Sequence, residues 1–445
     1  MSLPNHRRRR TYCRVQETLL TDHRSMPESS KHILVVGAGI VGVSTAIWAQ
    51  RAGANVTLID RVGPAAGTSF GNAGLLAAAS VVPVTTPGLM GKAPGMLFNP
   101  DKPLFLRWSY LPRLLPFLRR YLAHANADAV EHISVALTVL LADTAEQHLS
   151  LARGTAAESY ISVGDYLFGY GNRSDFDADA FAWGVRERRG FEYEVLEGRA
   201  LRAYDPALPH SIGLAARCPD HGWISDPGKY VNALAQHLTD EGGRFLTATL
   251  EDIALENGKA VAAITSAGRI EADEVIVTTG AWSGPLAKRL GVTMPLETER
   301  GYHLEFVNPS VTLKVPTMIT AGKFVVTPMA GRMRCAGVVE FGGLDAAPSR
   351  APFELLRRQT LKHFPDLTFD SVNEWMGHRP ATTDSLPVIG ASPNAANVWF
   401  GYGHQHIGLT AGPKTGRWLA QMALGQPPNI DLSAFAADRP AVMQG

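Results

Sequence analysis

The chain has 445 residues, of which 45% are hydrophobic and 19% are charged, and its formal net charge is +1. This length exceeds what one compact core usually holds and fits two interleaved domains. A net charge so close to zero gives no electrostatic footprint for nucleic acid. The three cysteines lie far apart in the sequence and lack metal-ligand spacing. We therefore predict no disulfide and no structural zinc site, and we expect the protein to be in a reducing compartment.

The first thirty residues differ from the rest in composition. Arg7 to Arg10 form an arginine run, and the polar stretch after it has no apolar periodicity. A twin-arginine export signal needs an apolar stretch there, and a mitochondrial transit peptide avoids the acidic residues that this segment contains. We therefore expect residues 1–30 to be a disordered tail, or an over-long start with Met26 as the true first residue.

A strand, a glycine loop, a helix and a second strand follow in that order. Residues 32–36 and 55–59 are apolar runs typical of buried strands, and 43–52 has the composition of a helix. The loop between the first strand and the helix reads Gly37-Ala38-Gly39-Ile40-Val41-Gly42. This order predicts a dinucleotide-binding fold, in which the helix N-terminus offers unpaired N–H groups to phosphates.

Each glycine of the loop has a physical task. Gly37 permits a tight turn, Gly39 lets the backbone approach a pyrophosphate, and Gly42 lets the helix pack closely on the strand. Asp60 ends the second strand, where its carboxylate can accept a hydrogen bond from a ribose hydroxyl. An acid at this position argues against NADP, but the loop alone does not decide between FAD and NAD.

Four separated motifs resemble, in the correct order, the D-amino acid oxidase superfamily of FAD enzymes. The match is closest to the bacterial D-amino acid dehydrogenase branch of that family, and it covers residues 32–426. The motifs are Gly67-Thr68-Ser69-Phe70-Gly71-Asn72-Ala73-Gly74, Gly222-Trp223-Ile224-Ser225-Asp226-Pro227, the stretch 274–283, and the stretch 377–416 that begins Gly377-His378-Arg379-Pro380. Without this resemblance, residues 67–74 could equally be a surface loop.

The resemblance implies an α/β fold (α+β overall) with two discontinuous domains. One would be a Rossmann-like FAD-binding domain, and the other a mostly antiparallel substrate-binding sheet. The FAD-binding domain would take residues 31–154 (with a helical insert at about 91–154), 225–295 and 376–430, and the substrate domain would take 155–224 and 296–375.

The resemblance also implies FAD as the cofactor. No histidine lies in residues 68–74, and Cys335 lies well before the final motif, so we expect FAD to be held without a covalent bond. The residues expected to bind it are Gly37, Gly39, Ile40, Val41, Gly42, Asp60, Arg61, Thr68, Ser69, Asn72, Ala73, Gly74, Thr279, Gly280, Trp282, Gly403, Gly408, Leu409 and Thr410.

Arg379 is the candidate anchor for the substrate. Because a flavin itself accepts the hydride, the protein must mainly hold the substrate carboxylate so that the α-hydrogen points at the flavin. A planar guanidinium binds a carboxylate through two parallel hydrogen bonds, and the arginine of the similar Arg-Pro motif in related oxidases has this role. The structural alternative is an ion pair between Arg379 and Asp384.

Three further residues are candidates for contact with the substrate. His404 and His406 lie in a glycine-rich loop before a helix predicted at 411–424, and either one contacts the substrate or both only bond the loop. They have no third ligand nearby, so we predict no metal site. Tyr302, beside His303, resembles a family segment that lines the active site and could bond the carboxylate, although an alternating strand explains it equally well.

Residues 96–122 mix leucine and aromatic residues with basic residues. This composition suits an element that lies on an anionic membrane surface, or a helical hairpin packed on the substrate domain. No run of about 18 apolar residues predicts a membrane-spanning helix. We expect a cytoplasmic protein. If residues 96–122 face a membrane, we expect it to be attached peripherally to the inner membrane.

The activity that the resemblance implies is oxidation of a small D-amino acid by hydride transfer to FAD, with electrons passed to a quinone or another respiratory acceptor. D-Proline or a hydroxy-D-proline is a variant substrate, because a secondary amine also suits such a site. The alternatives are an oxygen-using oxidase of glycine, sarcosine or a related amine, and a non-catalytic FAD-binding assembly factor.

Overall fold

The computed structural model describes residues 30–89, 91 and 104–441. The described residues from Lys31 onward belong to one compact unit. The tail expected at 1–30 therefore lies outside the described residues except for Ser30, and so does the first part of the 96–122 segment. Among the described helices no single one is long and apolar enough to cross a membrane, and one pair bent by 89°, Trp108–Ala123 with Ala127–Ala152, meets those criteria only when taken together.

Six strands form the first sheet, in the order β18-β19-β12-β1-β2-β8. All neighbours run parallel except β18, which is antiparallel to β19. The first predicted strand has the expected bounds, and the second is one residue longer. The strands are β1 (His32–Val36), β2 (Asn55–Asp60), β8 (Arg244–Thr247), β12 (Glu274–Val277), β18 (Val388–Ala391) and β19 (Val398–Tyr402).

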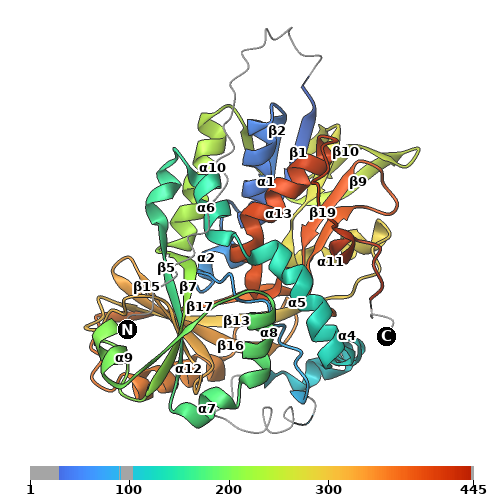
Figure 1. The fold of residues 1–445 in the computed structure, drawn as a ribbon. Helices are drawn as coiled ribbons and strands as arrows, with labels where there is room; N and C mark the ends of the chain where they lie inside the picture. Colours follow the sequence, from blue (N-terminus) through green and yellow to red (C-terminus); the bar gives the residue numbers. More distant parts are fainter. Residues whose placement is uncertain (1–29, 90, 92–103, 442–445) are drawn as a thin grey trace, which may run out of the picture. The chain divides into compact units, whose positions relative to one another are not determined.

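This sheet is covered on both faces, which explains why its central strand is apolar throughout. Ile33 and Val35 of β1 pack into a helical layer, whereas Leu34 and Val36 pack into a layer on the opposite face. The helical layer contains α1 (Ile40–Arg51), α5 (Ala127–Leu141), α6 (Thr144–Ala152), α10 (Pro227–Asp240) and α13 (Gly408–Ala423), with α1 and α13 side by side (Figure 1). The other layer contains α11 (Gly284–Arg289) and the antiparallel strands β9 (Leu250–Glu256), β10 (Lys259–Thr265) and β11 (Gly268–Glu271).

A second sheet of ten strands is mostly antiparallel. Its order is β17-β13-β16-β15-β14-β5-β7-β3, with β4 beside β16 and β6 beside β7. Only the pairs β14–β5 and β16–β4 run parallel. The strands are β3 (Leu75–Leu76), β4 (Leu104–Leu106), β5 (Ile161–Tyr170), β6 (Glu194–Glu197), β7 (Leu214–Ile224), β13 (Leu296–Val307), β14 (Thr317–Ile319), β15 (Phe324–Met329), β16 (Arg332–Phe341) and β17 (Ser371–Thr382).

The two faces of the second sheet have different partners. On one face, Tyr302, Leu304 and Phe306 of β13 pack in a core with Phe353 and Leu356 of α12 (Arg350–His363). The opposite face carries the alternate residues of β13 and meets the four-residue helix α2 (Thr68–Gly71) and the longer helix α4 (Leu111–Ala123). The remaining elements are α7 (Arg173–Asp177), α8 (Ala180–Arg188), α9 (Gly198–Tyr204) and the 3-10 turns η1 (Trp108–Tyr110), η2 (Ala156–Tyr160), η3 (Gly280–Trp282), η4 (Gln405–Ile407) and η5 (Ser433–Phe435).

The architecture confirms the α/β class with an antiparallel second sheet. The predicted domain boundaries stay a prediction, and one of them falls inside a strand. The boundary at 376 divides β17, which runs to Thr382 and belongs wholly to the second sheet. Pro116 lies inside α4, so proline at this position does not end that helix.

The close crossing of α1 and α13 depends on Gly416. A Cβ atom at this position would lie 2.5 Å from the backbone nitrogen of Thr45 and 2.6 Å from the Cβ of Ser44. We expect Gly416→Ala to lower the free energy of unfolding by about 1–3 kcal/mol, because extra volume in a packed interface forces the backbone apart. Chemical denaturation measures this change. Gly284→Ala is the control, since its Cβ would meet only Leu296 at 3.8 Å, and an equal effect of both substitutions would contradict the expectation.

Candidate functional site

The residues predicted to bind a nucleotide gather at the carboxyl ends of adjacent parallel strands. The glycine loop follows β1, Asp60 ends β2 and Thr279 lies just after β12, and these three strands are neighbours in the sheet. Gly403 follows β19, the next strand beyond β12. Open α/β sheets bind ligands at this edge, so the strand order brings together segments that are distant in the sequence.

The backbone at Gly37 and Gly42 leaves no room for a side chain. Gly37 has a φ of +104°, in the left-handed region, and a Cβ there would lie 2.6 Å from the carbonyl oxygen of Thr278. A Cβ at Gly42 would lie 1.8 Å from the carbonyl oxygen of Gly37. The tight turn and the close helix packing predicted for these two glycines are therefore both present.

Asp60 fixes the loop to the turn that follows β2. Its carboxylate accepts hydrogen bonds from the backbone N–H groups of Ala38 at 2.9 Å, Val62 at 2.8 Å and Gly63 at 3.1 Å. A carboxylate has about four lone-pair positions, so one remains for a ribose hydroxyl. Next to it, the guanidinium of Arg61 lies over the ring of Trp282, 4.1 Å from the centroid.

Two helix starts point at the same region. In α1 and α13, both fully described, no N-cap side chain closes the first turn and no acidic residue lies in it. Ile40 N–H donates to the hydroxyl of Ser69 at 2.9 Å. The other first-turn N–H groups, from Val41 in α1 and from Gly408 to Thr410 in α13, suit the negative charges of a pyrophosphate and of a reduced flavin. These residues thus fit FAD.

Residues 67–74 form an ordered turn around α2. Thr68 donates to the carbonyl of His378 at 2.9 Å, and the side chain of Asn72 bonds the carbonyl of Ser69 and the N–H of Gly74, both at 2.8 Å. Ala73 lies inside this closed turn. The segment is therefore held in one conformation and tied to β17.

The second sheet holds three successive carbonyls of this turn. His303 Nδ1 lies 2.7 Å from the carbonyl oxygen of Gly71, and Arg334 donates to the carbonyls of Phe70 and Asn72. His303 also stacks on Trp375, with ring centroids 5.2 Å apart. From the sequence we named His303 only as a neighbour of Tyr302, and we did not predict a role for Arg334 or Trp375. The alternating pattern of the strands that carry these residues was the signal that could have placed them on one face of the sheet.

Arg379 lies on β17 with its guanidinium unpaired. Within the described residues it makes no hydrogen bond and no ion pair, and the alternative partner Asp384 instead binds Arg439 at 2.7 Å. Burial lowers the pKa of Arg379 from its ordinary value, and the charge of Glu299 raises it in part. The residue is nevertheless only partly buried, so its guanidinium is accessible to a small ligand.

Gly301 makes room for this guanidinium. A Cβ at position 301 would lie 2.5 Å from Cζ and 2.6 Å from Nε of Arg379. The arginine side chain therefore runs along the sheet surface from β17 across β13. Gly377 and Gly71 similarly make room for Trp375, whose ring atoms would lie 1.9 Å and 2.1 Å from a Cβ at those two positions.

The two histidines of the 401–410 loop have different surroundings. His404 is buried, and its Nε2 lies 3.0 Å from the hydroxyl of Thr415 in α13. His406 makes no hydrogen bond within the described residues and is exposed. Desolvation lowers the pKa of His406 to about 4, with the positive charge of Arg379 as the second cause, so the imidazole lies near Arg379 and is neutral at neutral pH. His406 is thus the histidine that can reach a ligand held by Arg379.

Tyr302 is not brought together with Arg379. It alternates with Gly301 along β13 and so lies on the other face of the sheet, where its ring packs against Phe353 and its hydroxyl donates to Glu340 at 2.5 Å. Only 1% of the residue is exposed. This position argues against contact with a substrate carboxylate at Arg379.

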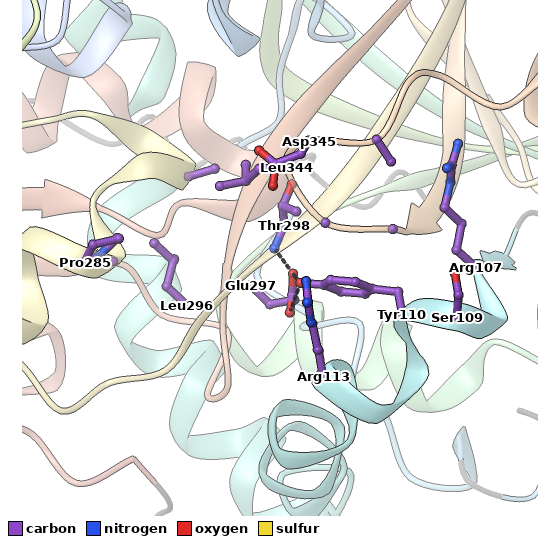
Figure 2. A pocket seen from close by; sticks show the side chains of 15 residues that line it. Arg107, Ser109, Tyr110, Arg113, Pro285, Leu296, Glu297, Thr298, Leu344 and Asp345 are labelled. Atoms are coloured by element: carbon purple, nitrogen blue, oxygen red, sulfur yellow. Dashed lines mark hydrogen bonds between the residues drawn. The ribbon is translucent and has the colours of Figure 1, made fainter.

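A cavity of about 540 Å³ lies beside the start of β13 (Figure 2). Its size is that of a small-molecule pocket, but none of the predicted site residues lines it. Tyr110 and Arg113 stand on one side and Glu297 and Thr298 on the other, with the hydroxyl of Tyr110 bonded to Glu297 at 3.1 Å. The described residues contain no group of three or more His, Cys, Asp or Glu side chains that could hold a metal ion.

Comparison with known proteins decides the family. Residues 32–422 match the family of FAD dependent oxidoreductases named DAO. The chain belongs to this family. FAD is therefore its cofactor, in agreement with the glycine loop, the free helix starts and the acid at position 60.

Relatives of known name match almost end to end. A D-amino-acid oxidase of Bradyrhizobium diazoefficiens is 37% identical over 421 residues, covering 93% of this chain and all of that protein. A D-amino acid dehydrogenase of Allorhizobium ampelinum is 31% identical over 430 residues, covering 92% of this chain and 99% of that protein. In structure, glycine oxidase from Bacillus cereus has the same fold, with a TM-score of 0.69 at 18% identity over 93% of this chain and all of that one.

The position of the Arg379 guanidinium can be tested through Gly301. We expect Gly301→Ala to raise the KM for an amino acid at least ~10-fold while FAD stays bound, because the new methyl group, 2.5 Å from Cζ, forces the guanidinium out of its position. Steady-state kinetics and the flavin absorbance of the purified protein measure the two effects. An unchanged KM would contradict the placement of Arg379. Gly164→Ala in β5 is the control, since its Cβ would meet side-chain atoms of Trp223 at 3.2 Å and of Val315 at 3.9 Å.

Proposed function

We propose that this chain oxidises the α-carbon–nitrogen bond of small D-amino acids, with Arg379 as the carboxylate anchor. The observation that carries the proposal is a desolvated guanidinium with all of its donors unused, next to a region that fits FAD. A planar fork of this kind is matched to a carboxylate. The names of the relatives from Bradyrhizobium diazoefficiens and Allorhizobium ampelinum support D-amino acids as the substrate class.

Arg379, His406 and the first turn of α13 would perform positioning and charge stabilisation. Bound FAD supplies a hydride acceptor at N5. Arg379 fixes the carboxylate through two parallel hydrogen bonds, which orients the α-carbon as well as placing it. Neutral His406 can accept a hydrogen bond from the substrate amine, and the first turn of α13 offers N–H groups to negative charge.

The electron acceptor in this proposal is a respiratory quinone. The α4 region supports it, because Leu115 is 54% exposed and Trp108 57% exposed, with Arg113, Arg119 and Arg120 also exposed beside them. Apolar and basic side chains together suit the surface of an anionic membrane. The proposed location is therefore cytoplasmic, with peripheral attachment to the inner membrane.

A second candidate is favoured by the name of one relative. The Bradyrhizobium diazoefficiens relative is named an oxidase, which supports molecular oxygen as the acceptor, and the glycine oxidase fold is compatible with a smaller amine such as glycine or sarcosine. D-Proline or a hydroxy-D-proline remains a variant substrate of the leading proposal. Rapid reoxidation of the reduced flavin in air would separate the oxidase from the dehydrogenase.

The anchor is tested by Arg379→Ala. We expect this variant to keep FAD and to lose at least ~100-fold in kcat/KM on the best amino acid, since about 3 kcal/mol is reasonable for a charge-assisted carboxylate contact. Steady-state kinetics measure the loss, and flavin absorbance verifies the cofactor. Arg350→Ala is the control, because that arginine is exposed and pairs with Glu374. Unchanged kinetics in Arg379→Ala would refute the assignment.

Membrane attachment is tested on the exposed apolar residue of α4. We expect Leu115→Asp to reduce sedimentation with vesicles that contain anionic phosphatidylglycerol at least ~5-fold, because it removes apolar contact and adds repulsion. Val163→Asp on β5 is the control, since Val163 is 56% exposed without neighbouring basic residues from α4. If wild type does not bind such vesicles, or if both variants behave alike, α4 is not a membrane contact.

A further inference from the structure

Glu299 is a buried carboxylate close to the proposed anchor. It lies on β13 directly opposite Arg379 of β17, so the two side chains rise from the same face of the sheet. Only 4% of the residue is exposed. A buried acid needs hydrogen bonds or an opposite charge to remain ionised, so its neighbours determine its state.

The surroundings of Glu299 are mostly apolar. On its other side β16 places Phe341 directly opposite, and Phe341 belongs to one buried cluster with Leu114 and Phe117 of α4 and with Ala381. The hydrogen bond that Glu299 accepts within the described residues comes from the hydroxyl of Tyr121, at 3.5 Å. That distance is long, so hydrogen bonding compensates the carboxylate poorly.

The positive charge of Arg379 stabilises the ionised form of Glu299 through space, without a direct contact. No ion pair joins these two described side chains, and the guanidinium of Arg379 lies over Gly301, two residues along β13 from Glu299. Glu299 therefore balances the guanidinium without occupying its N–H donors, and these stay free for a ligand. When a ligand carboxylate binds, it and the Glu299 carboxylate would be two negative charges beside the single positive charge of Arg379, in a region shielded from water.

Few other groups near Glu299 can change their charge. Tyr121 faces it from α4, Arg379 faces it from β17, and β16 places Phe341 beside it. His406 of the turn 405–407 lies near Arg379. Glu297 lies two residues along β13 on the same face, and burial raises its pKa as well. Burial raises the pKa of Tyr121 well above its usual range, and desolvation lowers that of His406 to about 4, so both are neutral between pH 6 and 9. A guanidinium keeps its charge.

We propose that Glu299 takes up one proton from solvent when a carboxylate binds to Arg379, so that the anchor balances one carboxylate at a time. Glu299 is thus a positioning residue that couples substrate binding to pH. The inference rests on the proposed function, because it requires Arg379 to be the carboxylate site. Burial raises the pKa of Glu299, whereas the charge of Arg379 and then the hydrogen bond from Tyr121 lower it in part.

The sign of the effect follows from this exchange. At low pH Glu299 is already protonated and a carboxylate meets an uncompensated guanidinium, so binding is tight. At high pH Glu299 is ionised, and binding must either repel it or draw in a proton, so binding weakens. A proton taken up with the ligand changes the dissociation constant up to tenfold for each pH unit.

The experiment is calorimetric titration of the FAD-loaded protein with benzoate between pH 6 and 9. Benzoate has a carboxylate and no amine, so no ligand group titrates in this range. For wild type we expect Kd to rise at least ~10-fold across the range, with proton uptake visible in buffers of different ionisation enthalpy. Glu299→Gln keeps the shape of the side chain and removes its titratable group. For this variant we expect no proton uptake on binding and a change in the Kd for benzoate of less than ~3-fold between pH 6 and 9.

Glu297→Gln is the matched control. Glu297 lies two residues away on the same face of β13, but it is bonded by Tyr110 and lines the cavity of Figure 2, so its variant should behave like wild type. Wild-type binding without proton uptake, or a pH profile unchanged by Glu299→Gln, would overturn the proposal. If Glu299→Gln does not fold, proton uptake in wild type and in Glu297→Gln decides alone. Equal benzoate binding by Arg379→Ala would instead refute the anchor, and with it the proposed function.

Discussion

The guanidinium of Arg379 is partly desolvated, and no hydrogen bond from the described residues compensates it. Removing a charge from water costs several kcal/mol, and a protein normally recovers that by pairing it. Here the pairing partner is left for a ligand. Much of the neighbouring structure follows from this constraint: Gly301 gives the side chain its path, Glu299 supplies the opposite charge at a distance, and His406 stays neutral beside it.

A second set of contacts joins the anchor to the cofactor region. His303 and Arg334 of the second sheet hold the carbonyls of residues 70–72, and Thr68 bonds β17 one residue before Arg379. The segment that resembles a flavin-contacting motif and the strand that carries the anchor are thus fixed to each other. Because hydride transfer depends on the alignment of substrate and flavin, this connection between the 67–74 turn and the second sheet would help to hold the two in register.

Patterns of neighbouring residues in the sequence predicted local structure correctly, but they did not predict which residues of different strands meet. The glycine loop, the strand before it and Asp60 were readable because their geometry is set by neighbouring residues along the chain. Tyr302 was selected without knowing which face of β13 meets the site, and a shift of one residue reverses the face. Glu299 became visible only when the register placed it opposite Arg379, which no pattern along the sequence determines.

The most direct test of the account is the visible spectrum of the FAD-loaded protein during anaerobic addition of amino acids. The account predicts that a small D-amino acid such as D-alanine or D-proline bleaches the flavin, and that the L-enantiomer leaves it oxidised. Bleaching by L-enantiomers alone would contradict the proposed handedness. A flavin that neither amino acids nor simple amines reduce would contradict the enzymatic role and favour a non-catalytic FAD-binding protein.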